Sequence, residues 1–243
     1  VTGDASFLVR GRPHGRTVTV PDYGFLIKGA SDKPILVDAG YRSEEVMRIF
    51  GFEAEIRPGC DLDLQLANHD LERGDIGMLV LTHLHLDHAG LVDRFPMSTP
   101  VVVNRAEMGY AASGAFFYLP EDLHHMIDRI NTPGALMFLD LNLTGPVEIA
   151  PGVTCELARG HTPGLMFVRA ETDEGVATIC SDVIYEIHGQ LLEPPHTLQA
   201  GEPQTSNNFT VSVLEEKAAI KRALNGTTFL LPSHCMGARV ECG

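Results

Sequence analysis

The 243-residue sequence is poor in basic residues. Its 18 lysines and arginines stand against 32 aspartates and glutamates, which gives a formal net charge of −14. Lysine and arginine form no cluster, whereas a protein that binds nucleic acid through phosphates needs a basic face. The same shortage argues against binding to an anionic membrane surface. We therefore expect neither a nucleic acid nor a membrane as a partner.

Long apolar runs are also absent, and none approaches the ~20 residues that a membrane-spanning helix needs. Residues 1–4 lack the charged-then-apolar pattern of a secretory signal, although the missing starting methionine leaves open that a segment was removed. The five cysteines form no Cys-x-x-Cys pair and their number is odd. This usage favours a reducing compartment over a disulfide scaffold, so the expected location is the cytoplasm.

The chain contains no linker that would separate domains. It has no Ser/Gly-rich run, no block of like charge, no low-complexity tract and no repeat at the usual periods. A chain of this length can form one large domain or two small ones. Without a linker, we expect one domain over residues 1–243, and the apolar content of 44% is sufficient for its core.

The most informative stretch is an apolar run that leads into a group of histidines. Residues 78–81 form a short continuous apolar run, which predicts a buried strand. In an extended chain, alternate side chains project to one side. That side carries His83, His85 and Asp87, and a turn at residues 89–90 would bring His88 to the same place. Imidazole and carboxylate groups are ligands for zinc, iron or manganese, so this strand end predicts a metal site.

This His-x-His-x-Asp-His segment resembles the signature of the metallo-β-lactamase superfamily of binuclear metallohydrolases. That family needs three further ligands downstream, and each candidate follows or ends a short apolar run: His161, Asp182 and His234. The resemblance covers residues 18–234. It implies an α/β fold, the four-layer αββα sandwich of the family, with the metals at one edge.

The resemblance also implies how two divalent metal ions are held. His83, His85 and His161 bind the first ion, Asp87, His88 and His234 bind the second, and Asp182 bridges them. Zinc is the first expectation, and iron, manganese and cobalt are alternatives. Two cations about 3.5–4 Å apart can share a hydroxide and lower its pKa towards neutrality. The implied nucleophile is therefore a metal-bridging hydroxide.

Three residues near these ligands receive predictions of their own. Asp38 lies at the end of the strand predicted at 34–40, and the aspartate of the family at this position usually lies under the metals and orients a ligand histidine. A turn residue before Gly40 is almost as good an interpretation of Asp38. Cys180 and Cys235 lie close to proposed ligands in the sequence, but the ligand set is complete without them. We expect both cysteines to be small buried hydrophobic residues.

Two ligand positions and one tyrosine narrow the activity within the superfamily. True β-lactamases lack an aspartate at the place of Asp182, and flavodiiron reductases have glutamate where His85 stands. Tyr185 follows Asp182 at the spacing at which N-acyl-homoserine lactone lactonases carry a tyrosine that hydrogen-bonds the lactone carbonyl. Leu165 is a departure, because those lactonases commonly have histidine there. The resemblance favours this lactonase subgroup.

The implied function is a hydrolase that opens a small-molecule cyclic ester, first an N-acyl-homoserine lactone. Tyr185 and the second metal would stabilise the oxyanion, and Asp87 would carry a proton to the leaving alkoxide. Alternatives are hydrolysis of another small cyclic amide, or of a thioester as in glyoxalase II, although residues 186–210 offer no lysine or arginine for glutathione. A non-catalytic metal-binding module is the alternative of a different class. The oligomeric state is open, and a homodimer is compatible with the sequence.

Periodicity predicts the remaining elements. Strands at 17–20 and 24–28 are expected to pair, and residues 113–135 and 183–209 are expected to be irregular. The aromatic residues 116–118 would form either a pocket wall or core packing. His124 and His125 are expected to face solvent. Helices are predicted at 43–50, 62–72, 105–112 and 209–224, and further strands at 34–40, 100–103, 136–139, 147–149, 153–158, 165–170, 176–181 and 227–231.

Overall fold

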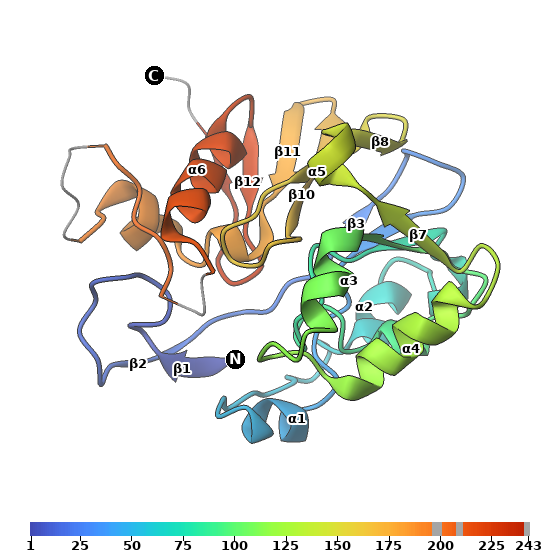
Figure 1. Ribbon diagram of the computed structural model, residues 1–243, viewed down its shortest axis with the longest axis horizontal. Coiled ribbons are helices and arrows are strands. Elements are labelled where there is room, and N and C mark those ends of the chain that lie inside the picture. Colours follow the sequence, from blue (N-terminus) through green and yellow to red (C-terminus); the bar gives the residue numbers. More distant parts are fainter. Residues whose placement is uncertain (196–200, 208–210, 241–243) are drawn as a thin grey trace. The chain divides into compact units, whose positions relative to one another are not determined.

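The computed structural model describes residues 1–195, 201–207 and 211–240 (Figure 1). The chain forms two compact units, one of Val1–Tyr23 with Gly145–Gly243 and one of Gly24–Thr144. Each unit has its own main sheet. The single domain expected over residues 1–243 stays a prediction. No helix of the described residues is both long and apolar enough to cross a membrane.

The Gly24–Thr144 unit contains a five-stranded sheet in which β4, β5, β6 and β7 run parallel and β3 is antiparallel to β4. Strands of a parallel sheet are buried on both faces and are therefore apolar along their whole length. Their carboxyl ends meet at one edge, and the chain continues from that edge into Asp38 and His83. The strands are β3 (Phe25–Ile27), β4 (Ile35–Val37), β5 (Met78–Val80), β6 (Val101–Asn104) and β7 (Leu136–Leu139).

The helices of this unit are short. Ser43 caps the start of the first one, because its Oγ accepts from the backbone N–H of Val46 at 3.2 Å. The second helix ends well before residue 72, because the chain turns through Asp70, whose φ is +58°. The helices are α1 (Glu44–Ile49), α2 (Leu62–Ala67), α3 (Arg105–Ala111), α4 (Pro120–Ile130) and α5 (Leu141–Thr144).

Helix α4 corrects the prediction that residues 113–135 are irregular. Pro120 is its first residue, a position where a missing N–H costs no helical hydrogen bond. The buried face of the helix includes Arg129, which is 0% exposed. The guanidinium of Arg129 donates to the backbone carbonyls of Thr99 and Phe95 at 2.9 and 2.8 Å. Because the buried side chain is an arginine that hydrogen-bonds carbonyl groups, this position adds nothing to the apolar pattern by which a helix is predicted from the sequence.

The two neighbouring histidines of α4 differ in environment. His124 is exposed, as predicted. His125 is half-buried and its Nε2 accepts from Arg129 Nε at 2.9 Å, so the prediction that it faces solvent is wrong. Burial, and after it the charge of Arg129, lower the pKa of His125.

The Val1–Tyr23 and Gly145–Gly243 unit contains a six-stranded sheet of order β13-β12-β11-β10-β9-β8. Only β11 and β12 are parallel neighbours. A separate two-stranded sheet pairs β1 with β2. The strands are β1 (Thr2–Asp4), β2 (Thr17–Thr19), β8 (Val147–Ala150), β9 (Val153–Leu157), β10 (Met166–Thr172), β11 (Gly175–Ile179), β12 (Phe229–Leu231) and β13 (Ala238–Arg239).

Two predictions in this unit need correction. Strand β2 pairs with β1 and not with residues 24–28, because the chain from Val20 to Gly24 forms no turn that would fold it back into a hairpin. Residues 183–209 are not wholly loop, since His188–Leu192 forms one turn of π-helix. The predicted helix over 209–224 is α6 (Val213–Leu224), and residues 209 and 210 lie outside the described residues.

Cys180 and Cys235, the two cysteines near the proposed ligands, differ in burial. Cys180 is fully buried in a cluster with Leu165 and Phe167, as predicted, and burial raises the pKa of its thiol. Cys235 is half-buried and its Sγ donates to the carbonyl of Met236, so the prediction of a buried residue is wrong for it. Cys242 lies outside the described residues.

We predict that Gly90→Ala lowers the free energy of unfolding by about 1–3 kcal/mol. A Cβ at Gly90 would lie 2.4 Å from the carbonyl oxygen of Leu86 and 2.5 Å from the backbone nitrogen of Arg42. The matched control is Gly109→Ala, in helix α3, where a Cβ meets nothing within 4 Å. Gly109→Ala should raise stability by up to about 1 kcal/mol, since alanine favours a helix. Chemical denaturation of both variants measures the difference, and an equal effect would contradict the close approach.

Candidate functional site

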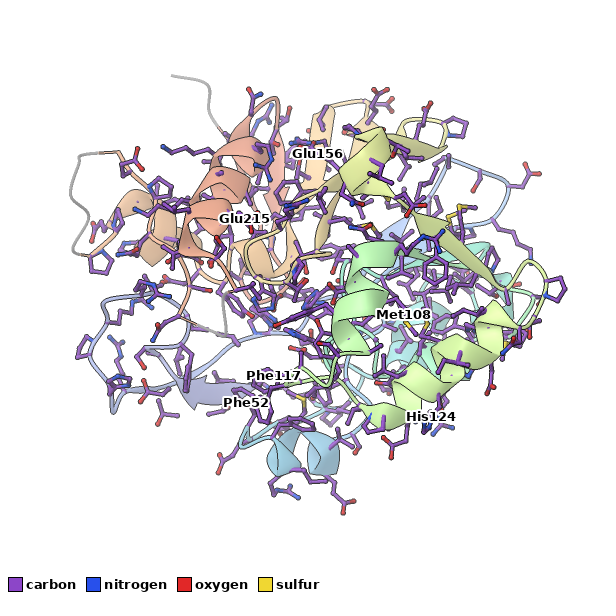
Figure 2. The ribbon with its side chains drawn as sticks, in the orientation of Figure 1. Phe52, Met108, Phe117, His124, Glu156 and Glu215 are labelled. Carbon is purple, nitrogen blue, oxygen red and sulfur yellow. The ribbon has the colours of Figure 1, made fainter. Side chains whose placement is uncertain are left out.

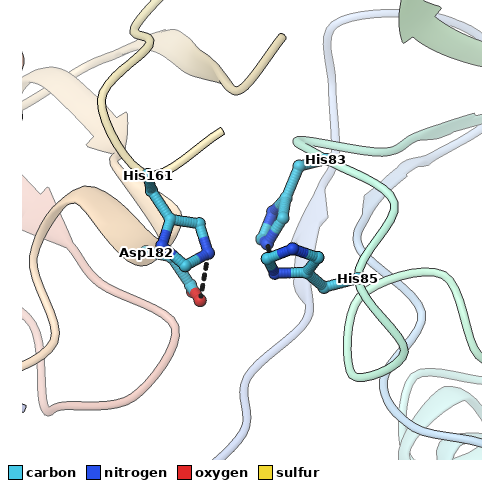
Figure 3. Close-up of side chains that lie close together, drawn as sticks. All are labelled: His83, His85, His161 and Asp182. Atoms are coloured by element: carbon cyan, nitrogen blue, oxygen red, sulfur yellow. Dashed lines mark hydrogen bonds and ion pairs between the residues drawn. The ribbon is translucent and has the colours of Figure 1, made fainter. Parts of the chain in front are cut away.

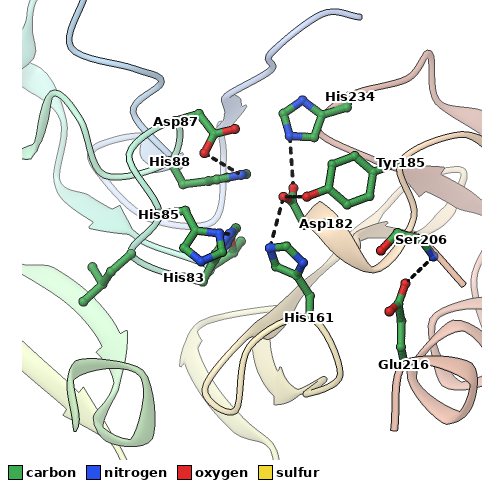
Figure 4. A network of polar contacts seen from close by, with 12 residues as sticks. His83, His85, Asp87, His88, His161, Asp182, Tyr185, Ser206, Glu216 and His234 are labelled. Carbon is green, nitrogen blue, oxygen red and sulfur yellow. Dashed lines mark hydrogen bonds and ion pairs between the residues drawn. The ribbon is translucent and has the colours of Figure 1, made fainter. Parts of the chain in front are cut away.

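The segment after β5 carries the predicted ligands of the Gly24–Thr144 unit (Figure 4). His83 and His85 are 0% and 6% exposed, and Nε2 of His83 lies 3.1 Å from Nδ1 of His85 (Figure 3). Leu84 and Leu86 are 2% and 1% exposed and pack into the interior. The alternation expected of an extended chain is confirmed, because the leucines anchor the segment while the histidines converge.

Thr82 determines which ring nitrogen of His83 carries the proton. Its hydroxyl donates to Asp38 Oδ2 at 2.8 Å, so toward His83 Nδ1, 3.2 Å away, the hydroxyl oxygen can only accept. His83 therefore carries its proton on Nδ1 and presents a lone pair on Nε2, which is the form that a metal ion binds. The sequence analysis did not identify Thr82, although its place directly before the histidines was a usable signal.

Asp38 is a buried carboxylate that orients a histidine. It is 1% exposed, accepts from the backbone N–H of Thr82 at 2.8 Å, and lies 2.8 Å from Nδ1 of His88 through Oδ2. A carboxylate on Nδ1 leaves Nε2 of His88 for a metal ion. Asp38 also has a φ of +60°, a strained backbone conformation for a residue other than glycine. The contact between Asp38 and His88 agrees with the predicted role of Asp38 as the group that orients this histidine, and metal binding by His88 stays a prediction.

Asp87 is the most accessible of the predicted ligands. Its side chain is 19% exposed, and Oδ1 lies 3.9 Å from Nε2 of His88 (Figure 4). The Gly24–Thr144 unit thus brings its four predicted ligands together: His83 lies beside His85, Asp87 lies beside His88, and the rings of His83 and His88 have centroids 4.0 Å apart.

The other unit brings its three predicted ligands together around one carboxylate. Asp182 is 1% exposed and follows β11 in a short 3-10 turn, Ser181–Val183. Its Oδ2 lies 3.4 Å from Nε2 of His161 and its Oδ1 lies 3.2 Å from Nε2 of His234 (Figure 4). Each oxygen of this carboxylate therefore faces a different histidine.

Local structure fixes the two histidines that flank Asp182. His234 follows β12, and its Nδ1 donates to the backbone carbonyl of Pro21 at 3.0 Å, which directs Nε2 to Asp182. His161 follows Gly160, whose φ is +93° and whose Cβ, if present, would lie 2.4 Å from Cα of Glu216. Only glycine fits this approach, so the glycine before His161 is a packing requirement.

Tyr185 lies against the same carboxylate. It is 3% exposed, its hydroxyl donates to Asp182 Oδ2, and its ring stacks on His234 with centroids 5.0 Å apart and an interplanar angle of 9°. Asp182 therefore lies against Tyr185 as well as against the predicted ligands His161 and His234.

The aromatic residues 116–118 combine the two roles that the sequence left open. Phe117 and Tyr118 are buried, whereas Phe116 is 58% exposed. The ring of Phe117 lies 5.7 Å from that of Phe52 (Figure 2). Tyr118 belongs to the core and also lines an apolar cavity of about 450 Å³ with Met108, Leu123, Ile127 and other residues of 108–127.

Comparison with known proteins gives the family. The sequence matches the model of the metallo-beta-lactamase superfamily over residues 23–234. The chain belongs to the metallo-β-lactamase superfamily. It is 28% identical over 185 residues to an N-acyl homoserine lactonase of a Bacillus species, covering 70% of this chain and 67% of that protein. An N-acyl homoserine lactonase of Bacillus thuringiensis is 26% identical over 181 residues, with the same coverage.

Solved structures agree with this result in fold. A B. thuringiensis AiiA variant with N-decanoyl-L-homoserine bound has a TM-score of 0.75 at 20% identity, covering 97% of this chain and 89% of that one. A probable metal-dependent hydrolase from Staphylococcus aureus has a TM-score of 0.72 at 18% identity, covering 98% and 88%. The predicted metallo-β-lactamase fold is confirmed, and this member of the superfamily is a metal-dependent hydrolase.

We predict that Asp38→Asn lowers the free energy of unfolding by about 1–3 kcal/mol, because the amide cannot accept all the hydrogen bonds that end on the carboxylate. Asparagine tolerates a positive φ, so the backbone strain is unchanged. Asp70→Asn is the matched control, since Asp70 has a φ of +58° and is exposed. Urea denaturation should show a loss for Asp38→Asn and almost none for Asp70→Asn. Equal stabilities would refute the role of Asp38.

Proposed function

We propose that the seven predicted ligands of the two units together hold two divalent metal ions and that the protein uses them to open a cyclic ester, first an N-acyl-homoserine lactone. In this proposal one set of residues holds the first ion, a second set holds the other, and Asp182 is shared. The first set is His83, His85 and His161, and the second is Asp87, His88 and His234.

The geometry of Asp182 is the observation that carries this proposal. Its two oxygens face two different histidines, His161 at 3.4 Å and His234 at 3.2 Å. The proposal assigns these histidines to different ions, and a carboxylate that bridges two cations presents one oxygen to each. A single metal ion would instead favour both histidines beside one oxygen. The donor set therefore fits two ions.

The ligands of the Gly24–Thr144 unit support the same division. His83 and His85 face each other through ring nitrogens 3.1 Å apart, and Asp87 lies beside His88. Each pair belongs to one proposed ion. The lone pair that Thr82 leaves on Nε2 of His83 and the Nε2 that Asp38 leaves on His88 both suit metal binding.

Nitrogen and carboxylate ligands are typical of zinc, and iron, manganese and cobalt are alternatives with the same ligands. Bound ions of this kind supply a Lewis acid and lower the pKa of water. Seven ligands for two ions leave coordination positions for water and substrate.

Two side chains would act directly on the substrate. The Tyr185 hydroxyl donates to Asp182 Oδ2, so it lies beside the proposed bridging ligand. To stabilise a carbonyl oxygen that becomes negative during ring opening, its single proton would turn from Asp182 to that oxygen. Asp87 is the least buried ligand, with 19% of its side chain exposed. It can pass a proton to the leaving alkoxide and exchange it with solvent.

The substrate class rests on the relatives. The similar curated proteins are named N-acyl homoserine lactonases, and similar structures contain N-decanoyl-L-homoserine or N-hexanoyl-L-homoserine. Hydrolysis of a thioester such as that of glutathione has less support, because residues 186–210 contain no lysine or arginine to bind the carboxylates. A location in the cytoplasm and a homodimer stay predictions.

We predict close to two metal ions per chain, because two sets of ligands are proposed. Elemental analysis of the purified protein measures this ratio, and removal of the metals with a chelator should abolish hydrolysis. Asp182→Asn should lower the ratio to one or less, because it weakens a ligand shared by both ions. One ion per chain in a fully active wild-type enzyme would contradict the binuclear proposal.

We predict that the enzyme opens N-acyl-homoserine lactones at neutral pH and that Tyr185→Phe lowers kcat by about 10-fold, with the KM little changed. The loss is moderate because the metals continue to stabilise the oxyanion. A panel of lactones, cyclic amides, thioesters and phosphodiesters tests the substrate class. Tyr110→Phe is the control for loss of a phenol. Turnover of thioesters alone would refute the substrate, and an unchanged kcat on every lactone would remove Tyr185 from the reaction.

A further inference from the structure

The segment that carries the first histidines is held from behind at two points. Leu84 and Leu86 alternate with the ligand histidines, and each donates its backbone N–H to a later part of the same unit. The Leu84 N–H donates to Oε1 of Glu107 at 3.1 Å, and the Leu86 N–H donates to the carbonyl of Phe117 at 3.0 Å. The backbone on both sides of His85 is therefore fixed.

Glu107 is a buried carboxylate at the centre of these contacts. It lies on helix α3, is 0% exposed, and its Oε1 also accepts from the hydroxyl of Tyr118 at 2.7 Å. A buried carboxylate is costly unless donors compensate its lost hydration. A leucine at this position would pack in the same core without that cost, so packing alone does not account for a carboxylate.

Tyr118 connects Glu107 to a proposed metal ligand. Its ring lies against the ring of His85, with centroids 4.8 Å apart at an interplanar angle of 64°. An edge-to-face contact of this kind restricts the plane of the imidazole. The hydroxyl of the same ring is held by Glu107. One carboxylate thus restrains His85 twice, through the preceding backbone N–H and through the ring beside it.

We propose that Glu107 is a positioning residue for the first metal ion, acting on His85 through Leu84 and Tyr118. This inference rests on the proposed function, because it presumes that His85 binds a metal. A ligand that is already held in its binding orientation loses less conformational entropy when the ion binds. Residues that hold a metal ligand in this way commonly change the metal affinity by about 10–100-fold.

The test compares four variants of the full chain. Glu107→Ala removes the acceptor, Glu107→Gln keeps an acceptor oxygen but removes the charge, and Tyr118→Phe keeps the ring but removes its hydroxyl. Tyr110→Phe is the matched control, because Tyr110 lies on α3 and its ring contacts Tyr118 with centroids 5.9 Å apart. Competition with a chromophoric chelator measures the affinity for zinc, and the visible spectrum of the cobalt-substituted protein reports the ligand geometry.

We expect Glu107→Ala to lower the affinity for one of the two ions by about 10-fold or more. The spectrum of the cobalt-substituted variant should differ from that of the wild type. Tyr118→Phe should weaken the same ion by a smaller factor, and Glu107→Gln should restore most of the affinity that alanine loses. The control should match the wild type. A purely structural role would lower the thermal stability of the variants while the affinity and spectrum of the folded protein stayed unchanged.

Failure of the inference and failure of the proposed function give different results. If the wild type binds no metal, the proposed function is wrong. If the wild type binds two ions and every variant retains affinity within about twofold and the same cobalt spectrum, Glu107 has no positioning role. Should Glu107→Ala fail to fold, Glu107→Gln and Tyr118→Phe decide, since both preserve the packing volume. The inference would then be overturned if both Tyr118→Phe and Glu107→Gln had the metal affinity and the cobalt spectrum of the wild type.

Discussion

The buried carboxylate of Asp182, shared between two histidines, is the interaction on which the rest of this account depends. A carboxylate that is 1% exposed must be compensated. The Tyr185 hydroxyl donates to its Oδ2, and His161 and His234 lie 3.4 and 3.2 Å from its two oxygens, where the proposed cations would supply the remaining compensation. Each of these ligand candidates follows a strand: His161 follows β9, Asp182 follows β11 and His234 follows β12. Because each oxygen faces its own histidine, the arrangement fits a bridge between two cations better than a single ion pair.

Two further buried acids extend the same principle within the Gly24–Thr144 unit. Asp38 holds His88 by its Nδ1, and Glu107 holds the backbone between His83 and His85. Both are almost fully buried, and neither is a proposed ligand. Their hydrogen bonds run from buried positions to His88 and to the backbone beside His85. The buried carboxylates therefore help to set the orientation of these histidines. A superfamily hydrolase needs this orientation before any substrate arrives.

The sequence predicted much of this arrangement, because ligands at strand ends follow apolar runs. Because alternate side chains of an extended chain point to opposite sides, the segment after β5 was predicted to place His85 at the site and Leu84 in the core. Each predicted ligand further along the chain follows a recognisable strand. Helix α4 was missed because Pro120 resembles a break, although it is the first residue of the helix. The partner of β2 was also missed, since pairing depends on a turn that the chain does not make. Contacts such as Tyr118 with His85 join distant residues and leave no local pattern.

A crystal structure of the metal-loaded protein, with anomalous difference maps on both sides of the metal absorption edge, tests the central claim most directly. The account predicts two peaks about 3.5–4 Å apart, one beside each oxygen of Asp182. The peak at Oδ2 should also contact His161, and the peak at Oδ1 should contact His234. A single peak, or two peaks of which neither touches Asp182, would contradict it.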